Sequence, residues 1–312
     1  MDTFDEIVGQ QAAKDKLSFF LSGYKQTQIL DPILFVAPKG CGKSLFSRSL
    51  AKKLTRSDGS SHKDFIEINC SVIENLGHFF DSVVFPYVVN GDVTLFLDEA
   101  SEIPHDLTMA LLTILNPNPQ NTNDFVYQNN TISFDLKKTS WIIATSEAQK
   151  VFPPLVDRLE RIDLEEYNLE ELGLIIQKGF SQIKFDKKTL IDIASTLRGN
   201  PRSAQKTTNK IKQYSEWNKI QVFGQNEWQD FKKRLHIQPL GLSPLEIQIL
   251  KILEQNGETS LTSLSAKTGM SKESLQKDVE LFLLKNSLIE IRTRGRCLTN
   301  NGFSYLKKLK SK

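Results

Sequence analysis

The sequence predicts an α/β fold: a parallel sheet covered by helices on both faces, then a small helical domain and a winged helix. Three observations support this. Short apolar runs alternate with helical segments in the first half, as they do in parallel sheets. Helical periodicity without strand runs follows Pro153-Pro154, and a helix–turn–helix pattern with a hairpin ends the chain. These changes divide the chain into 1–164, 165–238 and 239–312.

Four short apolar runs are the expected strands of the sheet. Each is too short for a helix and is bounded by turn residues or a helical pattern, which favours buried strands. They cover residues 33–36, 65–68, 93–97 and 141–144. Helical spacing over 43–54 follows the first of them. Two more runs, 125–127 and 131–134, lie around Gln128-Asn129-Asn130 and predict a protruding hairpin over 124–136.

The second half contains helical patterns and one later hairpin. Helices are expected in the small helical domain over 168–179, 187–197 and 201–217. Pro239-Leu240-Gly241 then interrupts the chain. Beyond it, a winged helix is predicted from helices at about 243–255, 260–267 and 271–285 and from strands near 288–292 and 296–299.

Composition excludes several classes of protein. The 312 residues are 39% hydrophobic and 25% charged, which is globular composition, and no run approaches the roughly 18 apolar residues of a membrane helix. The acidic N-terminus lacks the form of a signal peptide. The three cysteines, Cys41, Cys70 and Cys297, are widely separated and form neither a disulfide framework nor a zinc pattern. We therefore expect a reducing, cytoplasmic location.

Charge is distributed unevenly along the chain. Residues 1–164 carry 15 basic and 21 acidic side chains, whereas residues 240–312 carry 12 basic and 7 acidic ones. The basic excess thus lies in the C-terminal half, where an anionic partner such as nucleic acid is more plausible than at the front. A solvated lysine surface explains the same excess equally well.

A phosphate-binding loop is predicted at Ala37-Pro38-Lys39-Gly40-Cys41-Gly42-Lys43-Ser44, between a strand and a helix. Gly40 and Gly42 let backbone N–H groups point at phosphate oxygens, and the helix adds its positive end. Lys43 is expected on the β- and γ-phosphates, and Ser44 on Mg²⁺. The alternative is a glycine turn with a chance Gly-Lys-Ser.

Two carboxylates end the third strand, in Leu95-Phe96-Leu97-Asp98-Glu99. An ionised carboxylate at the end of a buried strand is costly unless it has a partner such as Mg²⁺. We expect Asp98 to hold the metal through water and Glu99 to polarise the attacking water. A strand that simply ends in acidic residues is the alternative, but both motifs in this order predict an ATP and Mg²⁺ site.

With these motifs, the chain resembles the AAA+ ATPases over nearly its whole length. Among them it resembles the RuvB family of Holliday-junction branch-migration motors. The resembling segments are Phe4-Asp5-Glu6-Ile7-Val8-Gly9-Gln10, Leu97-Asp98-Glu99, Ile143-Ala144-Thr145, Pro154-Leu155-Val156-Asp157-Arg158, Glu166-Tyr167-Asn168, Arg198-Gly199-Asn200-Pro201-Arg202 and Arg294-Gly295-Arg296. The resemblance implies an AAA+ nucleotide-binding domain at 1–164, a helical lid and a DNA-binding winged helix.

Residue roles are implied by the same resemblance. Thr145 is the sensor near the γ-phosphate, Arg158 the arginine finger, and Glu99 the catalytic carboxylate. Nucleotide contacts are implied for Ile7, Val8, Gly40, Cys41, Gly42, Lys43, Ser44, Leu45, Asp98, Tyr167 and Arg202, metal contacts for Ser44 and Asp98, and DNA contacts for Arg292, Arg294 and Arg296.

Each implied role has a simpler alternative. Arg158 could form a structural salt bridge with Asp157, and Arg202 could be an exposed arginine at a helix start, although a cation there is unfavourable for the helix dipole. The wing arginines occupy alternate positions and are expected on one side of a strand or tip, where a solvated turn is the alternative. Departures from the family pattern include Ala37, Lys39, Ser44, Glu147 and Val156.

The expected function is an ATP-driven ring, hexameric by resemblance, that translocates double-stranded DNA at Holliday junctions. By resemblance, a RuvA-like partner would bind the hairpin, with Phe125, Val126 and Tyr127 as an exposed apolar tip; a hairpin packed on its own domain is the alternative. The rival functions are a nucleotide-switched DNA-binding or loading protein, similar to clamp loaders or initiators, and a degenerate ATPase acting as a scaffold.

Overall fold

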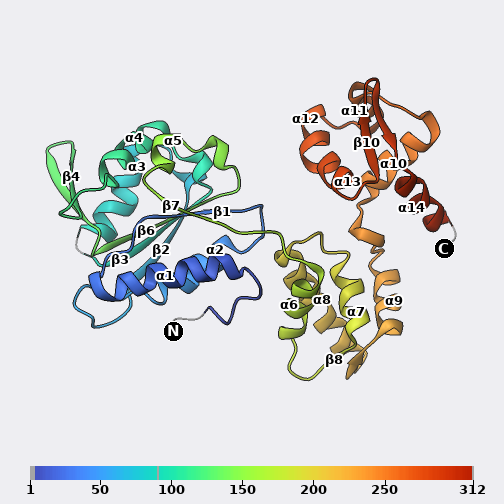
Figure 1. The fold of residues 1–312 in the computed structure, drawn as a ribbon, viewed down its shortest axis with the longest axis horizontal. Helices are drawn as coiled ribbons and strands as arrows, with labels where there is room; N and C mark the ends of the chain where they lie inside the picture. Colours follow the sequence, from blue (N-terminus) through green and yellow to red (C-terminus); the bar gives the residue numbers. More distant parts are fainter. Residues whose placement is uncertain (1–3, 90, 311–312) are drawn as a thin grey trace. The chain divides into compact units, whose positions relative to one another are not determined.

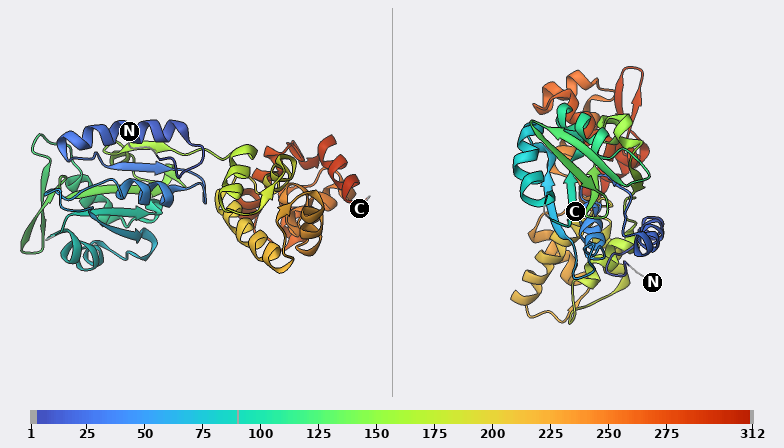
Figure 2. Two further views of the ribbon diagram at one scale, coloured as in Figure 1. Left: turned by 90° about the horizontal axis from the view of Figure 1, so that it is seen from below. Right: turned by 90° about the vertical axis from the view of Figure 1, so that its left-hand side faces the viewer.

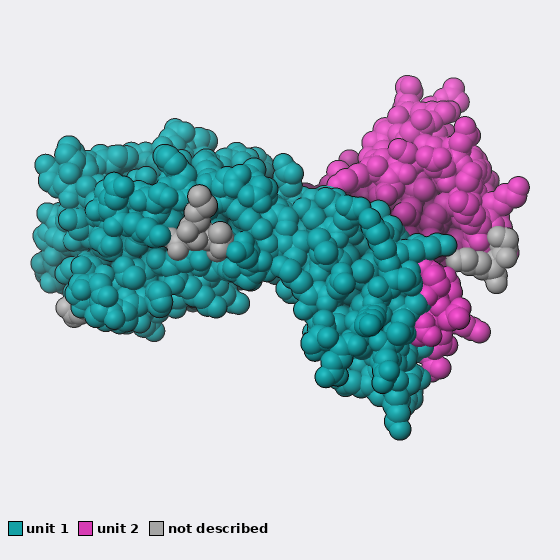
Figure 3. All heavy atoms as spheres, turned by 60° about the horizontal axis from the view of Figure 1, so that its bottom comes forward, with its two compact units in different colours: residues 1–224 teal, residues 225–312 magenta. Residues whose placement is uncertain are grey.

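The computed structural model describes residues 4–89 and 91–310 (Figure 1). The chain forms two compact units that divide after Gly224, each coloured separately in Figure 3. This division places helix α9 (Gln225–Arg234) in the second unit, whereas the sequence placed the boundary at 238/239. The three-domain division therefore stays a prediction.

A five-stranded parallel sheet forms the core of the first unit. Its strand order is β2 (Asp64–Asn69), β3 (Val93–Asp98), β6 (Thr139–Thr145), β1 (Ile33–Val36) and β7 (Glu160–Asp163). This confirms the predicted α/β class and the four predicted strands. The sequence missed β7 because only Ile162 of its four residues is buried, so it contains no apolar run.

Helices cover both faces of this sheet (Figures 1 and 2). Helices α1 (Gln11–Thr27) and α2 (Lys43–Ala51) pack on one face; α3 (Leu76–Phe79), α4 (His105–Ile114) and α5 (Pro153–Val156) lie on the other. Alternate residues of β6 enter the two cores: Ile142 faces α1 and α2, whereas Trp141 faces α4. Burial on both sides explains why the strands read as continuous apolar runs.

The lid helices follow the sheet within the same unit. They are α6 (Leu169–Lys178), α7 (Lys187–Ala194) and α8 (Pro201–Trp217), as the sequence predicted. A two-residue parallel ladder, β8 (Lys184–Phe185) with β9 (Val222–Phe223), joins the segment before α7 to the segment after α8. These strands are too short for a periodic signal, and the sequence did not predict them.

The predicted hairpin is confirmed as β4 (Thr122–Tyr127) paired with β5 (Asn130–Asp135). Its expected apolar tip is wrong for two residues. The ring centroids of Phe125 and Tyr127 lie 5.5 Å and 4.2 Å from that of Phe80, in the π-helix η2 (Phe80–Val88). Because strand side chains alternate, only Val126 of the three points outward, with 68% exposure. The hairpin is thus packed on its own domain.

The second unit has the predicted winged-helix elements. Helices α10 (Pro244–Asn256) and α11 (Leu261–Thr268) precede a helix that runs from α12 (Lys272–Ser274) through η6 (Leu275–Glu280) to α13 (Leu281–Lys285). The wing is β10 (Ile289–Arg292) paired with β11 (Gly295–Leu298). An unpredicted helix, α14 (Asn300–Lys310), buries Tyr305 and Leu306 against the unit's core. No helix in the described chain is long and apolar enough to cross a membrane.

A lysine is buried directly before β2, at the amino-terminal edge of the sheet. Lys63 is 4% exposed and donates hydrogen bonds from Nζ to the Lys137 carbonyl, at 2.6 Å, and to Ser140 Oγ, at 2.9 Å. Burial lowers the pKa of Lys63 from 10.5 to about 8, opposed by the charges of Asp92 and Asp135.

The lowered pKa of Lys63 makes the free energy of unfolding depend on pH. Between pH 8 and 10.5 the unfolded chain holds a proton that the folded protein has lost, so folding becomes more favourable as pH rises. We expect a gain of about 2 kcal/mol from pH 7.5 to 9.5 relative to Lys63→Met, which cannot titrate. Urea unfolding of both proteins at several pH values measures this. A constant difference between them would contradict the prediction.

Candidate nucleotide site and wing surface

A cavity of about 680 Å³ lies between the carboxyl edge of the sheet and the lid helices. Parallel sheets characteristically bind ligands at this edge, because the strand ends and helix N-termini converge there. Nine of the eleven residues predicted for nucleotide contact line the cavity: Ile7, Val8, Gly40, Gly42, Lys43, Ser44, Leu45, Tyr167 and Arg202. Cys41, within the loop, is buried, and Asp98 is the last residue of β3. Nucleotide binding by these residues stays a prediction.

The phosphate loop has the backbone that its glycines permit. Gly40 and Gly42 have φ of 86° and 102°, in the left-handed region that favours glycine, and α2 begins directly afterwards at Lys43. Lys43 is 7% exposed and donates from Nζ to the Ala37 carbonyl at 2.9 Å. Burial lowers the pKa of this lysine, whereas the charges of Glu99 and Asp98 raise it.

The two acidic residues at the end of β3 differ in environment. Burial raises the pKa of Asp98, and its Oδ1 accepts the N–H of Glu99 at 2.9 Å. Glu99 has φ 55° and ψ 53°, a strained backbone for a residue with a side chain and one that recurs at functional sites. A half-buried carboxyl and the Ser44 hydroxyl are hard oxygen donors, so these residues fit Mg²⁺.

The structure brings a second hydroxyl, next to the predicted sensor residue, to Glu99. Thr145 is fully buried and its Oγ1 accepts the backbone N–H of Glu147 at 3.0 Å, so its role as the sensor stays a prediction. The next residue, Ser146, donates from Oγ to Glu99 Oε2 at 3.3 Å. Because β6 alternates sides, a shift of one residue decides which hydroxyl faces the site. Thr145 and Ser146 are adjacent hydroxyl residues at the end of β6, and this pair was the sequence signal that could have identified Ser146.

Replacing Ser146 with alanine tests this assignment. We expect ATP hydrolysis to slow by about tenfold with ATP affinity unchanged, because Glu99 loses a hydrogen bond that orients it. Steady-state kinetics and nucleotide titration measure the two effects. Ser82→Ala, at a hydroxyl that bonds only its own helix through the His78 carbonyl, is the matched control. Full turnover in Ser146→Ala would contradict the prediction.

The N-terminal segment is bonded to the junction between sheet and lid. Gln10 donates from Nε2 to the Glu165 carbonyl at 2.7 Å and accepts the Glu165 N–H through Oε1 at 3.0 Å. Tyr167 is 5% exposed, and burial raises its pKa to about 12. Movement of the lid about this junction would therefore displace residues at the cavity wall.

Arg158 is not paired with Asp157, so that alternative is wrong. Its guanidinium donates to the carbonyls of Leu112, at 3.1 Å, and Pro154, at 2.6 Å, and to Asn116 Oδ1 at 3.4 Å. It does not line the cavity of its own chain. The role of Arg158 as an arginine finger stays a prediction.

The wing arginines do not lie on one side of a strand, which corrects the expectation for Arg296. Arg292 pairs across the hairpin with Gly295 and Arg296 with Ile291, so the two arginines face opposite sides. Arg296 is 13% exposed and donates from Nε and Nη2 to the buried carboxylate of Glu280, at 2.6 Å and 2.9 Å. Arg296 therefore holds the wing to η6. Its predicted contact with DNA would require this buried ion pair to break.

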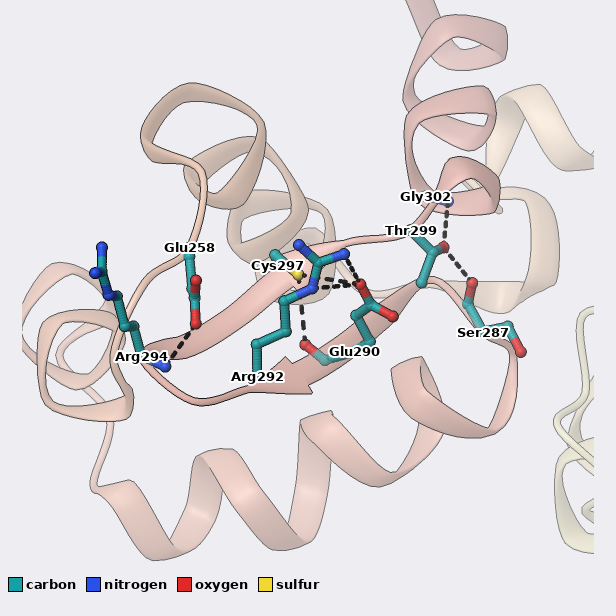
Figure 4. A network of polar contacts seen from close by, with 8 residues as sticks. All are labelled: Glu258, Ser287, Glu290, Arg292, Arg294, Cys297, Thr299 and Gly302. Atoms are coloured by element: carbon teal, nitrogen blue, oxygen red, sulfur yellow. Dashed lines mark hydrogen bonds and ion pairs between the residues drawn. The ribbon is translucent and has the colours of Figure 1, made fainter.

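The other two arginines lie at the solvent-facing end of the wing (Figure 4). Arg292 forms an ion pair with Glu290, which also approaches Cys297. Arg294 donates its backbone N–H to Glu258 at 2.6 Å, but its guanidinium has no carboxylate partner among the described residues. Figure 4 shows this side chain extending away from the Arg292–Glu290 pair. Arg294 is thus the wing cation most accessible to a phosphate.

Two family models match the chain. Residues 33–167 match the ATPase family associated with various cellular activities (AAA), and residues 239–307 match the RuvB C-terminal winged helix domain. The first match covers the sheet with its phosphate loop. The second covers the helices and the wing of the second unit.

Curated proteins and solved structures match over nearly the whole chain. The Holliday junction branch migration complex subunit RuvB of Campylobacter jejuni subsp. doylei is 26% identical, covering 97% of this chain and 90% of its own. The protein of that name from Campylobacter concisus is 28% identical, covering 94% and 86%. The structure of the Thermotoga maritima RuvB Holliday junction branch migration motor superposes with a TM-score of 0.76 at 23% identity, covering 98% of this chain and 97% of its own.

Proposed function

This chain is a divergent RuvB-like member of the AAA+ ATPases, and we propose that it hydrolyses ATP to translocate double-stranded DNA, driving branch migration of Holliday junctions. The proposal keeps the three-part division: a nucleotide-binding domain at 1–164, a lid at 165–238 and a winged helix at 239–312. The observation that carries it is the cavity lined by the phosphate loop and Arg202, whose Lys43 also feels the charges of Asp98 and Glu99 at the end of β3.

Each group of residues at the cavity has a separate role in binding or hydrolysis. The loop amides and Lys43 hold the triphosphate, while Arg202 reaches it from the first turn of α8. Ser44 and Asp98 would hold Mg²⁺, which when bound neutralises charge on the phosphate oxygens. Glu99, oriented by Ser146, accepts a hydrogen bond from the attacking water and polarises it.

A ring of subunits completes this site. Because Arg158 lies outside its own cavity, it would neutralise transition-state charge on the γ-phosphate of a neighbour's nucleotide. To reach that phosphate, Arg158 must break some of its hydrogen bonds to Leu112, Pro154 and Asn116. ATP hydrolysis would therefore require contact between neighbouring subunits of the ring. We propose a hexamer, by analogy with the ring motors that the chain resembles.

DNA binding is proposed for the wing, with Arg294 as the main contact. We expect Arg294→Ala to weaken duplex DNA binding about three- to tenfold. The slope of the logarithm of the binding constant against the logarithm of salt concentration should become shallower by about one, as loss of one phosphate contact does. Arg292→Ala is the comparison, because its charge is already paired with Glu290. Fluorescence anisotropy at several salt concentrations measures both. An equal or larger loss in Arg292→Ala would contradict the assignment.

Arg296 needs a separate readout. Removing its side chain leaves Glu280 buried without a partner, so Arg296→Ala should lower the stability of the winged helix by about 3 kcal/mol. Loss of DNA binding in that variant would then reflect unfolding, and it does not count as evidence for a contact.

The proposal extends to partners and location. A RuvA-like partner would bind hairpin 124–136 through its polar edge and Val126, since Phe125 and Tyr127 are packed inward. Cytoplasmic location is supported by Cys41, Cys70 and Cys297, which are all buried and form no disulfide within the described chain.

The decisive experiment is migration of a synthetic four-way DNA junction by the purified protein, with and without a candidate partner. ATP-dependent separation of the junction into its product duplexes supports the motor. Binding of the junction without its movement would instead indicate a nucleotide-switched loading protein, the rival function.

A further inference from the structure

The N-terminal end of lid helix α8 is capped by Asn200. Its Oδ1 accepts the backbone N–H groups of Arg202, at 2.9 Å, and Ser203, at 3.3 Å. Both partners are donors, so this end of the side-chain amide must be the oxygen. The orientation of Asn200 is therefore fixed by the helix that it caps, and its NH₂ group points away from α8.

The NH₂ group of Asn200 contacts the phosphate loop directly. Nδ2 donates to the carbonyl of Lys39 at 3.0 Å, across 161 residues of sequence. The approach is so close that a Cβ added to Gly40 would lie 2.5 Å from Asn200 Oδ1. Glycine is thus required at Gly40 for contact with the lid as well as for its φ of 86°.

A second bond anchors the same end of α8. The carbonyl of Gly199 accepts the N–H of Tyr167 at 3.2 Å, which joins the helix start to the junction that follows the sheet. Asn200 is separated from Arg202 by Pro201 alone, whose ring fixes φ. The bond to Lys39 therefore sets the position of the Arg202 backbone relative to the loop that holds the phosphates.

We propose that Asn200 is a positioning residue that bonds the lid to the phosphate loop and places Arg202 at the triphosphate before nucleotide binds. The inference rests on the proposed ATP site and specifies how that site is assembled. A lid already held at the loop loses less conformational freedom on binding, so the bond increases ATP affinity by preorganisation. It also gives the loop a direct mechanical connection to α8.

Asn200→Ser separates the two roles of this side chain. Serine is a good N-cap, so α8 keeps its cap, but its hydroxyl is too short to reach Lys39 as well, and no charge is added beside the phosphates. We expect the Kd for Mg²⁺-ATP to rise three- to tenfold in calorimetric titration, with the unfolding midpoint unchanged. In the nucleotide-free protein, hydrogen exchange in the first turn of α8 should increase.

A double-mutant cycle tests whether Asn200 acts through Arg202. In an Arg202→Ala background the effect of Asn200→Ser on ATP affinity should vanish, because there is no guanidinium left to place. Asn75→Ser is the matched control: Asn75 caps α3 through His78 N–H and has no bond to the phosphate loop. It should leave ATP affinity and exchange in α8 unchanged.

Wild-type affinity and unchanged exchange in Asn200→Ser would overturn the inference while leaving the ATP site intact. Additive effects in the cycle would overturn it too. Failure of the wild-type protein to bind ATP would instead overturn the proposed function. If Asn200→Ser lowers the unfolding midpoint, Asn200→Asp keeps the cap oxygen without the NH₂ donor. Hydrogen exchange of that variant without nucleotide then decides, and unchanged exchange in α8 would again refute the bond's role.

Discussion

Replacing Lys43 with alanine is expected to abolish measurable ATP binding. In the structure this ammonium group is buried beside the phosphate loop and bonded only to main-chain carbonyls, Ala37 and Pro38, within the described chain. A triphosphate would give it charge-assisted hydrogen bonds that no other side chain replaces. We expect affinity for Mg²⁺-ATP to fall by at least about 100-fold, measured by calorimetry.

Lys52→Ala is the matched control for that experiment. Lys52 is exposed just beyond the other end of α2, so its loss removes the same charge without touching the cavity. Lys52→Ala should bind ATP as the unmodified protein does. Unchanged DNA-stimulated hydrolysis in Lys43→Ala would show that the nucleotide site lies elsewhere.

Replacing Arg158 with alanine should spare ATP binding and reduce hydrolysis by at least about 1000-fold, the scale of effect that arginine fingers have. The reason is that Arg158 does not line its own cavity and is proposed to act on a neighbour's nucleotide. Arg161→Ala, which removes a nearby exposed arginine paired with Asp163, should retain activity. Thermal melting checks the cost of the three bonds that Arg158 makes to its own chain.

Mixed rings test whether Arg158 acts between subunits. Arg158→Ala subunits keep an intact cavity, and Lys43→Ala subunits keep an intact arginine, so neither hydrolyses ATP alone. Mixing them should restore part of the activity, because some cavities then face a neighbour with Arg158. Failure of every mixture to recover activity, despite ring formation, would contradict action between subunits.

Much of the fold could be predicted because its signals are local. Short apolar runs that alternate with helical patterns indicated β1, β2, β3 and β6, and helical spacing indicated the lid and the winged helix. Strand β7 lacked such a run because only Ile162 is buried, and β8 and β9 have two residues each. These strands exist through pairing with distant segments, which local periodicity does not report.

The candidate site shows the same limit at the scale of side chains. The sequence located the phosphate loop and the β3 acids, whose chemistry is carried by residue type and order. It did not show which of two adjacent hydroxyls faces Glu99, nor that Arg296 would be paired with Glu280. Both depend on strand alternation relative to distant partners. The bond between Asn200 and Lys39 likewise joins segments with no common pattern.

The aromatic packing of the hairpin has a mechanical consequence. Stacking of Tyr127 on Phe80, with Phe125 beside it, fixes the turn end of the hairpin to the sheet domain, because Tyr127 pairs with Asn130 next to the turn. A force applied at this turn would therefore act on the domain directly and would bend the hairpin little. A protein that pulled on this hairpin could thereby transmit its force to the machinery at the strand ends.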